Sequence, residues 1–144
     1  GSGSKRIELE RMVSSRKIEG VNFVDVPDGK VPETQGSADV MLLPIKKGAA
    51  SSSIPSKLPA YMFSKKPIIA SVDVDSESAR LINESKSGWV VAPENIDMLV
   101  NIMREAYLSE KSDLELKGKN GFNFAMENLS KKNNLKQLVK AILE

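Results

Sequence analysis

The chain has 144 residues, enough for one domain with a hydrophobic core, and a net charge of +2. With 40% hydrophobic and 28% charged residues it has the composition of a soluble globular protein, and its low net charge argues against a dedicated nucleic-acid or membrane surface. It contains no cysteine and no histidine, which excludes disulfides, thiol chemistry and histidine as a general base or metal ligand.

The N-terminal part is predicted to contain a helix and two strands. Residues 5–17 read as a short helix, and residues 21–26 (VNFVDV) alternate in the way that predicts a strand. Residues 39–45 form a continuous apolar run, which is typical of a strand buried on both faces of a parallel sheet.

Helices and strands are then predicted to alternate. We expect helices over residues 56–64, 76–85, 95–108, 113–128 and 132–143, and strands over residues 67–72 and 89–91. Ser76 is placed to cap its helix and Gly88 to end it, while Trp89 is interpreted as a core residue. The pattern predicts an α/β fold, a Rossmann-like parallel sheet flanked by helices, in one domain over residues 1–144.

The loop over residues 46–57 is the first candidate binding site. It is small and polar, and it leads into a predicted helix whose free amides and dipole attract phosphate. Ser53 and Ser56 would add hydroxyl donors, and Lys57 would add a cation. Ligands of open parallel sheets bind beyond the carboxyl ends of the strands, where this loop belongs. A surface loop that binds nothing is the alternative.

Three acidic residues, Asp73, Asp75 and Glu77, follow the next predicted strand at the same edge. A metal site is conceivable, but no second group of ligands accompanies them. An acidic helix start, capped by Ser76, is therefore the favoured interpretation.

Five segments follow one another along the chain: ADVMLLP (residues 38–44), SIPSKL (53–58), YM (61–62), KPIIAS (66–71) and SGWVV (87–91). This series resembles the C-terminal, donor-binding half of the GT-B glycosyltransferases of group 1 (family 4). Its SIPSK stretch is most similar to bacterial enzymes of colanic acid, capsule and O-antigen synthesis.

The resemblance implies that a sugar passes from a nucleotide-diphosphate sugar to a polysaccharide or lipid-linked acceptor, with retention and without a metal or other cofactor. The residues implied in donor binding are Ser52, Ser53, Ile54, Pro55, Ser56, Lys57 and Ala60. Asp73, Asp75 and Glu77 would lie at the cleft rim, and no catalytic residue is identified.

The resemblance also implies that the opening strand, helix and strand of this half, and the whole N-terminal acceptor domain, lie outside this chain. We therefore expect the chain alone to be inactive. The absence of any apolar run of membrane-spanning length predicts a cytoplasmic location, with the parent enzyme there or at the inner face of the membrane.

The sequence departs from the family pattern at two places. Many members carry two glutamates where this chain has Ser52 and Ala60, and Lys65 replaces the glycine that usually precedes the Lys-Pro pair. A non-catalytic binding or assembly module on the same fold, or a fragment without any ligand, are therefore alternatives. The strand predicted over residues 21–26 would also lack neighbours, so we expect self-association through an exposed strand edge, strand rearrangement or low stability.

Overall fold

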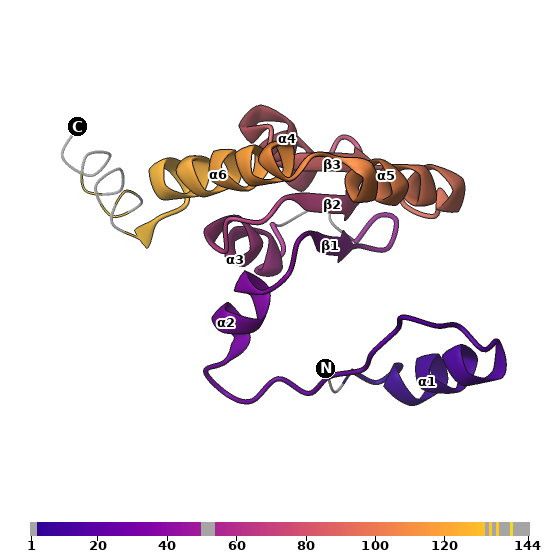
Figure 1. Cartoon of the computed structure of the whole chain (residues 1–144). Helices are drawn as coiled ribbons and strands as arrows, with labels where there is room; N and C mark the ends of the chain where they lie inside the picture. Colours follow the sequence, from indigo (N-terminus) through magenta and orange to yellow (C-terminus); the bar gives the residue numbers. More distant parts are fainter. Residues whose placement is uncertain (1–2, 50–53, 132, 134, 136–138, 140–144) are drawn as a thin grey trace. The chain divides into compact units, whose positions relative to one another are not determined.

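The computed structural model describes residues 3–49, 54–131, 133, 135 and 139. The chain divides into two compact units, Gly1–Thr34 and Gln35–Glu144 (Figure 1). Within the described part, no helix is both long and apolar enough to cross a membrane. The helix predicted over residues 132–143 falls almost entirely outside the described residues.

The second unit contains a parallel sheet of three strands, ordered β1-β2-β3 (Figure 1). The strands are β1 (Met41–Pro44), β2 (Ile68–Ser71) and β3 (Gly88–Val91), and the helices that follow them are α3 (Lys57–Phe63), α4 (Glu77–Ser85), α5 (Ile96–Leu108) and α6 (Lys111–Asn128). Strands that run parallel require a crossover between them, and α3 and α4 provide these crossovers. The predicted Rossmann-like α/β fold is confirmed.

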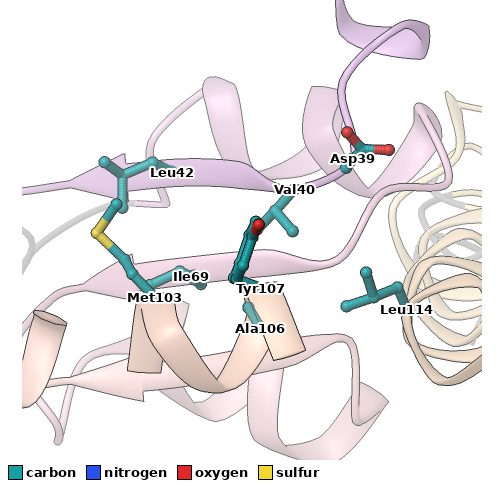
Figure 2. A pocket seen from close by; sticks show the side chains of 8 residues that line it. All are labelled: Asp39, Val40, Leu42, Ile69, Met103, Ala106, Tyr107 and Leu114. Atoms are coloured by element: carbon teal, nitrogen blue, oxygen red, sulfur yellow. The ribbon is translucent and has the colours of Figure 1, made fainter. Parts of the chain in front are cut away.

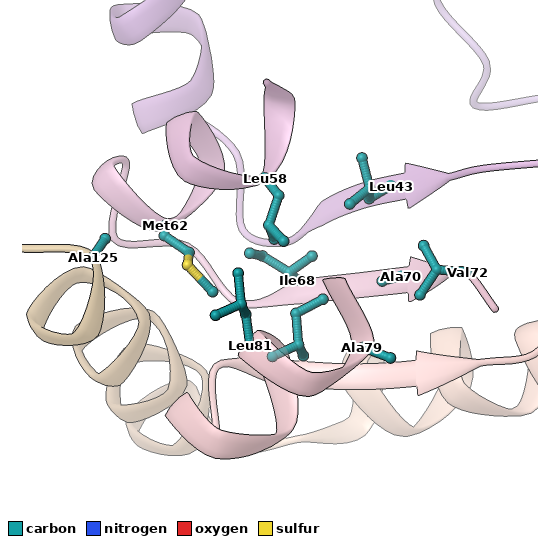
Figure 3. Close-up of a cluster of buried hydrophobic side chains, with 10 residues drawn as sticks. Leu43, Leu58, Met62, Ile68, Ala70, Val72, Ala79, Leu81 and Ala125 are labelled. Carbon is teal, nitrogen blue, oxygen red and sulfur yellow. The ribbon is translucent and has the colours of Figure 1, made fainter. Parts of the chain in front are cut away.

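One face of the sheet forms the hydrophobic core with α3, α4 and α6 (Figure 3). Alternate strand residues point to the same face, so Leu43 of β1 meets Ile68 and Ala70 of β2 there. Leu58 and Met62 of α3 are fully buried against them. Each such side chain contributes roughly 1.5–3 kcal/mol when it is removed from water, which fixes α3 on this face.

The predicted Ser76 cap is present at the start of α4, and Asn95 caps the start of α5 in the same way. The Ser76 hydroxyl accepts a hydrogen bond from the Ala79 amide at 3.2 Å, and the Asn95 side chain accepts one from the Met98 amide at 3.0 Å. Each cap satisfies an amide that has no partner within its own helix. The starts of both helices are therefore fixed by local sequence.

Helix α4 ends where it was predicted to end, but Gly88 is not the residue that ends it. The helix ends at Ser85, and Lys86 adopts a left-handed conformation with φ of 52°. Gly88 instead begins β3, where an added Cβ would lie 1.8 Å from the carbonyl oxygen of Ile68. The glycine is needed for this close approach of two backbones and not for a helix end.

In the first unit, none of residues 3–34 is buried. Helix α1 (Arg6–Ser15) agrees with the predicted helix, whereas α2 (Val31–Gly36), at the boundary of the two units, was not predicted. Arg6 bonds both to Glu10, at 2.7 Å, and to Asp25. These contacts link α1 to the segment that follows it.

The prediction of a strand over residues 21–26 is wrong, because this segment does not adopt a strand in the structure. Its alternating pattern favours a strand, but the described residues of the first unit contain no strand with which it could form ladder hydrogen bonds. Val21 and Val24 remain 45% and 59% exposed. The expected self-association or low stability is not decided by this finding and stays a prediction.

Helix α6 packs closely against the backbone at Lys65 because Gly118 of α6 has no side chain. A Cβ there would lie 2.1 Å from the carbonyl oxygen of Lys65, a backbone atom that cannot easily move aside. We expect Gly118→Ala to lower the free energy of unfolding by about 1–3 kcal/mol through overpacking, measured by urea unfolding. Gly36→Ala is the control, since nothing lies within 4 Å of its added Cβ. Equal unfolding midpoints for Gly118→Ala and wild type would contradict the close approach.

Candidate functional site

Two loops meet at the carboxyl edge of the sheet, the edge at which the carboxyl ends of the strands lie. Residues 46–49, named here the β1 turn, follow β1, and the Ala49 amide donates to the Lys46 carbonyl oxygen at 3.0 Å within it. Asp73 follows β2, and its Oδ2 accepts a hydrogen bond from the Gly48 amide at 2.8 Å. The sequence predicted polar loops at this edge, and the structure joins two of them directly.

The start of α3, predicted to bind phosphate, offers few free amides. Pro59 has no N–H, and the Leu58 amide donates to the Pro55 carbonyl oxygen at 2.9 Å. The Ser56 side chain makes no capping hydrogen bond. Lys57 is exposed, so the strongest attraction that this start offers an anion is the Lys57 ammonium group.

The position of α3 along the sheet also limits this prediction. In Figure 3 the side chain of Leu58 lies next to Ile68, the first residue of β2, and away from Val72, which follows the end of that strand. Helix α3 therefore starts nearer to the amino ends of the strands than to the carboxyl edge. Any contribution of Lys57 to a ligand at that edge has to come through its long side chain.

The other predicted donor-binding residues differ in exposure. Ser52 and Ser53 lie outside the described residues. Ile54 and Ser56 are exposed, whereas Pro55 and Ala60 are half-buried. Ala60 stands inside α3 and offers only a methyl group, so the hydrogen bonds that a family glutamate would make at this position have no counterpart here.

The three residues predicted at the cleft rim have different roles. Asp73 holds the β1 turn, and Asp75 is exposed, with no bonded partner among the described residues. Glu77 lies in the first turn of α4 and pairs with Arg80, which also bonds Glu84 at 2.7 Å. The hydrogen bonds from Arg80 lower the pKa of Glu77 below its ordinary value. Glu77 therefore agrees with the favoured interpretation, an acidic helix start.

The described part of the chain contains no group of three or more acidic side chains arranged to hold a metal ion. Trp89, interpreted from sequence as a core residue, is only half-buried. Its indole N–H donates to Glu105 at 2.7 Å, and the Lys117 ammonium lies 4.8 Å from its ring centre. Trp89 thus forms part of a surface pocket of 310 Å³, because β3 is the outer strand of the described sheet and leaves this side chain at the surface.

The second face of the sheet carries an apolar groove that the sequence did not reveal (Figure 2). It has a volume of 510 Å³, and its lining residues include Leu42 of β1, Ile69 of β2, Met103 and Tyr107 of α5, and Leu114 of α6. Apolar residues recur along α5 at helical spacing, and Met103 and Tyr107 of this stripe line the groove. However, Met103 is 47% and Tyr107 88% exposed, because the stripe faces this open groove. Periodicity locates such a stripe but cannot show what covers it.

The family described as glycosyl transferases group 1 matches residues 1–108, a range that includes the whole described sheet and its crossover helices. No curated protein matches the chain. Because the family match spans most of the chain and agrees with the Rossmann-like fold, this chain belongs to the group 1 glycosyltransferases.

Proposed function

We propose that the chain supplies part of the site for a nucleotide-diphosphate sugar, the donor of a glycosyl transfer reaction. The observation that carries the proposal is the family match over a parallel sheet whose carboxyl edge holds joined polar loops. Open parallel sheets bind their ligands at this edge. Exposed cations follow β1: Lys46 and Lys47 in the β1 turn, and Lys57 at the start of α3.

The chemistry of the transfer explains why cations are useful there. The bond between the sugar and the diphosphate breaks, and its electron pair stays on the departing diphosphate. A new bond forms to the oxygen of an acceptor hydroxyl, whose proton passes to the diphosphate. Negative charge therefore grows on the diphosphate, and nearby ammonium groups and amides stabilise it. With Ala60 at one family glutamate position, we assign the chain an electrostatic role and no acid–base role.

The sequence resemblance extends the proposal to the rest of the reaction. It favours a polysaccharide or lipid-linked acceptor, of the kind used in bacterial surface polysaccharide synthesis in the cytoplasm. The acceptor would bind to a further glycosyltransferase domain that completes the cleft. Glycosyl transfer is therefore proposed for the assembled enzyme, and binding of the donor nucleotide for this chain.

A second candidate, a non-catalytic assembly module, is favoured by the apolar groove. Contiguous exposed apolar surface marks interaction sites in soluble proteins. The groove adjoins β1, which has a partner strand on only one side within the described sheet. The Met41 and Ile45 amides bond toward β2, so by alternation the Leu42 amide points to the open side, where Pro44 offers no N–H. The groove, more than this poor strand edge, would drive association.

The donor proposal is tested by nucleotide titration. We expect Lys57→Ala to weaken binding of UDP or GDP by about 10- to 100-fold, because losing a hydrogen bond to a charged group costs roughly 1.5–3 kcal/mol. Isothermal titration calorimetry of the full chain measures this. Lys119→Ala removes the same charge from an exposed position on α6 and should change the Kd by less than about twofold. Absence of binding by the wild-type chain at millimolar nucleotide would overturn the proposal and favour the assembly module.

The assembly candidate is tested by light scattering. Met103 in the groove and Met126 on α6 are both 47% exposed, so they form a matched pair. If the groove drives self-association, the wild type and Met126→Glu form dimers or larger species at high protein concentration, whereas Met103→Glu stays monomeric because a charge enters the apolar contact. A monomeric wild type, or identical behaviour of the two variants, would remove the groove as an association surface.

A further inference from the structure

The hydrogen bond between Gly48 and Asp73 connects positions 25 residues apart in the sequence. Asp73 is half-buried, and its carbonyl oxygen accepts a second hydrogen bond, from the amide of Ser76, at 3.0 Å. Ser76 is the N-cap of α4. Asp73 therefore joins the β1 turn to the fixed start of a helix.

The β1 turn gains little order from packing. All four of its residues are exposed, and Gly48 has φ of 75°, a left-handed conformation that glycine adopts without strain. The last sheet contact before the turn is the bond from the Ile45 amide to the Ser71 carbonyl oxygen, at 2.8 Å. Beyond it, the bond to Asp73 is a hydrogen bond by which the turn is held to the rest of the second unit.

A carboxylate is a poor direct ligand for a diphosphate. Ionised Asp73 can only accept hydrogen bonds, and its negative charge repels a second anion. Its Oδ2 is also occupied by the Gly48 amide. A role for Asp73 in donor binding therefore has to act through the loop that it holds.

We propose that Asp73 is a positioning residue of the donor site. By holding the Gly48 amide, it fixes the β1 turn so that the ammonium groups of Lys46 and Lys47 stay at the carboxyl edge, where they meet the diphosphate of the nucleotide. This inference rests on the proposed function. It assigns the turn to the diphosphate part of the ligand and gives the fixed carboxylate a reason to lie beside an anion site.

Electrostatics alone and the positioning role predict opposite results for one substitution. Asp73→Ala removes a negative charge near the ligand, which by charge alone would tighten UDP binding. The positioning role predicts instead that Asp73→Ala weakens binding, by about tenfold for the loss of one hydrogen bond. Asp73→Asn removes the charge but keeps a side-chain oxygen that accepts from Gly48, so it should bind UDP as tightly as wild type or more tightly.

The matched control is Asp75→Ala, two residues away, where the carboxylate is exposed. It removes the same charge without touching the β1 turn, and it should bind UDP at least as tightly as wild type. Calorimetry with UDP gives the affinities of all variants. Equal UDP affinity of Asp73→Ala and Asp73→Asn, or tighter binding by Asp73→Ala, would overturn the positioning role.

Amide hydrogen exchange of Gly48, followed by NMR without nucleotide, separates this inference from the function on which it rests. Exchange should be faster in Asp73→Ala and close to wild type in Asp73→Asn. Unchanged exchange in Asp73→Ala would overturn the hydrogen bond as the element that orders the turn. If exchange responds as expected while the wild type binds no UDP, the donor function itself is overturned.

Discussion

The second unit depends on the burial of β2 between its two neighbours. All four residues of this strand are buried, because helices cover both of its faces and β1 and β3 pair with its two sides. Parallel pairing obliges the chain to cross over the sheet between strands, so the positions of α3 and α4 follow from it. The register also aligns the strand ends: the Ile45 amide bonds Ser71, and the Val72 amide bonds Val91 at 3.0 Å. This alignment brings the loops after β1 and β2 close enough for Asp73 to reach Gly48.

The two faces of the sheet are filled to different degrees. On the core face, Leu58 and Met62 of α3 are fully buried, and α6 packs closely through its glycines. On the second face, the buried residue of α5 is the small Ala106, while the larger Met103 and Tyr107 turn to the groove. The chain thus has more apolar surface on this face than its described residues cover. Such a surplus is what makes an interaction at the groove physically reasonable.

Much of this fold was predictable because the signals for it are local. The strands near Leu43, Ile69 and Val90 are short apolar runs, and the starts of α4 and α5 carry their own caps. The errors concern contacts between distant parts of the chain. Residues 21–26 have the pattern of a strand but are not among the strands of the described sheet, and Gly88 allows a close contact with Ile68 that no local pattern shows.

Lys65, where the family pattern is expected to have glycine, combines a strained backbone with a stabilising side-chain contact. Its φ of 58° is left-handed, a conformation that glycine adopts without strain and that costs another residue roughly 1–2 kcal/mol. Its ammonium group lies 4.4 Å from the ring centre of Phe122, and such a contact contributes about 0.5–1 kcal/mol at an exposed site. The cation–π contact therefore offsets part of the backbone cost and links the segment after α3 to α6.

The sequence predicts at which edge of the sheet the candidate site lies, but not how the residues of the site contact one another. Polar loops after two strands were predicted from the sequence. The number of free amides at the start of α3 was predicted too high, because the Leu58 amide donates to the Pro55 carbonyl oxygen, and this hydrogen bond depends on the backbone conformation. The bond from Gly48 to Asp73, whose partners are far apart in sequence, was not predicted. That bond places a negative charge beside the cations proposed to bind a diphosphate. The arrangement is favourable if ordering matters more than charge: immobilising a loose lysine costs roughly 0.5–1.5 kcal/mol on binding, and a turn ordered in advance avoids part of that cost.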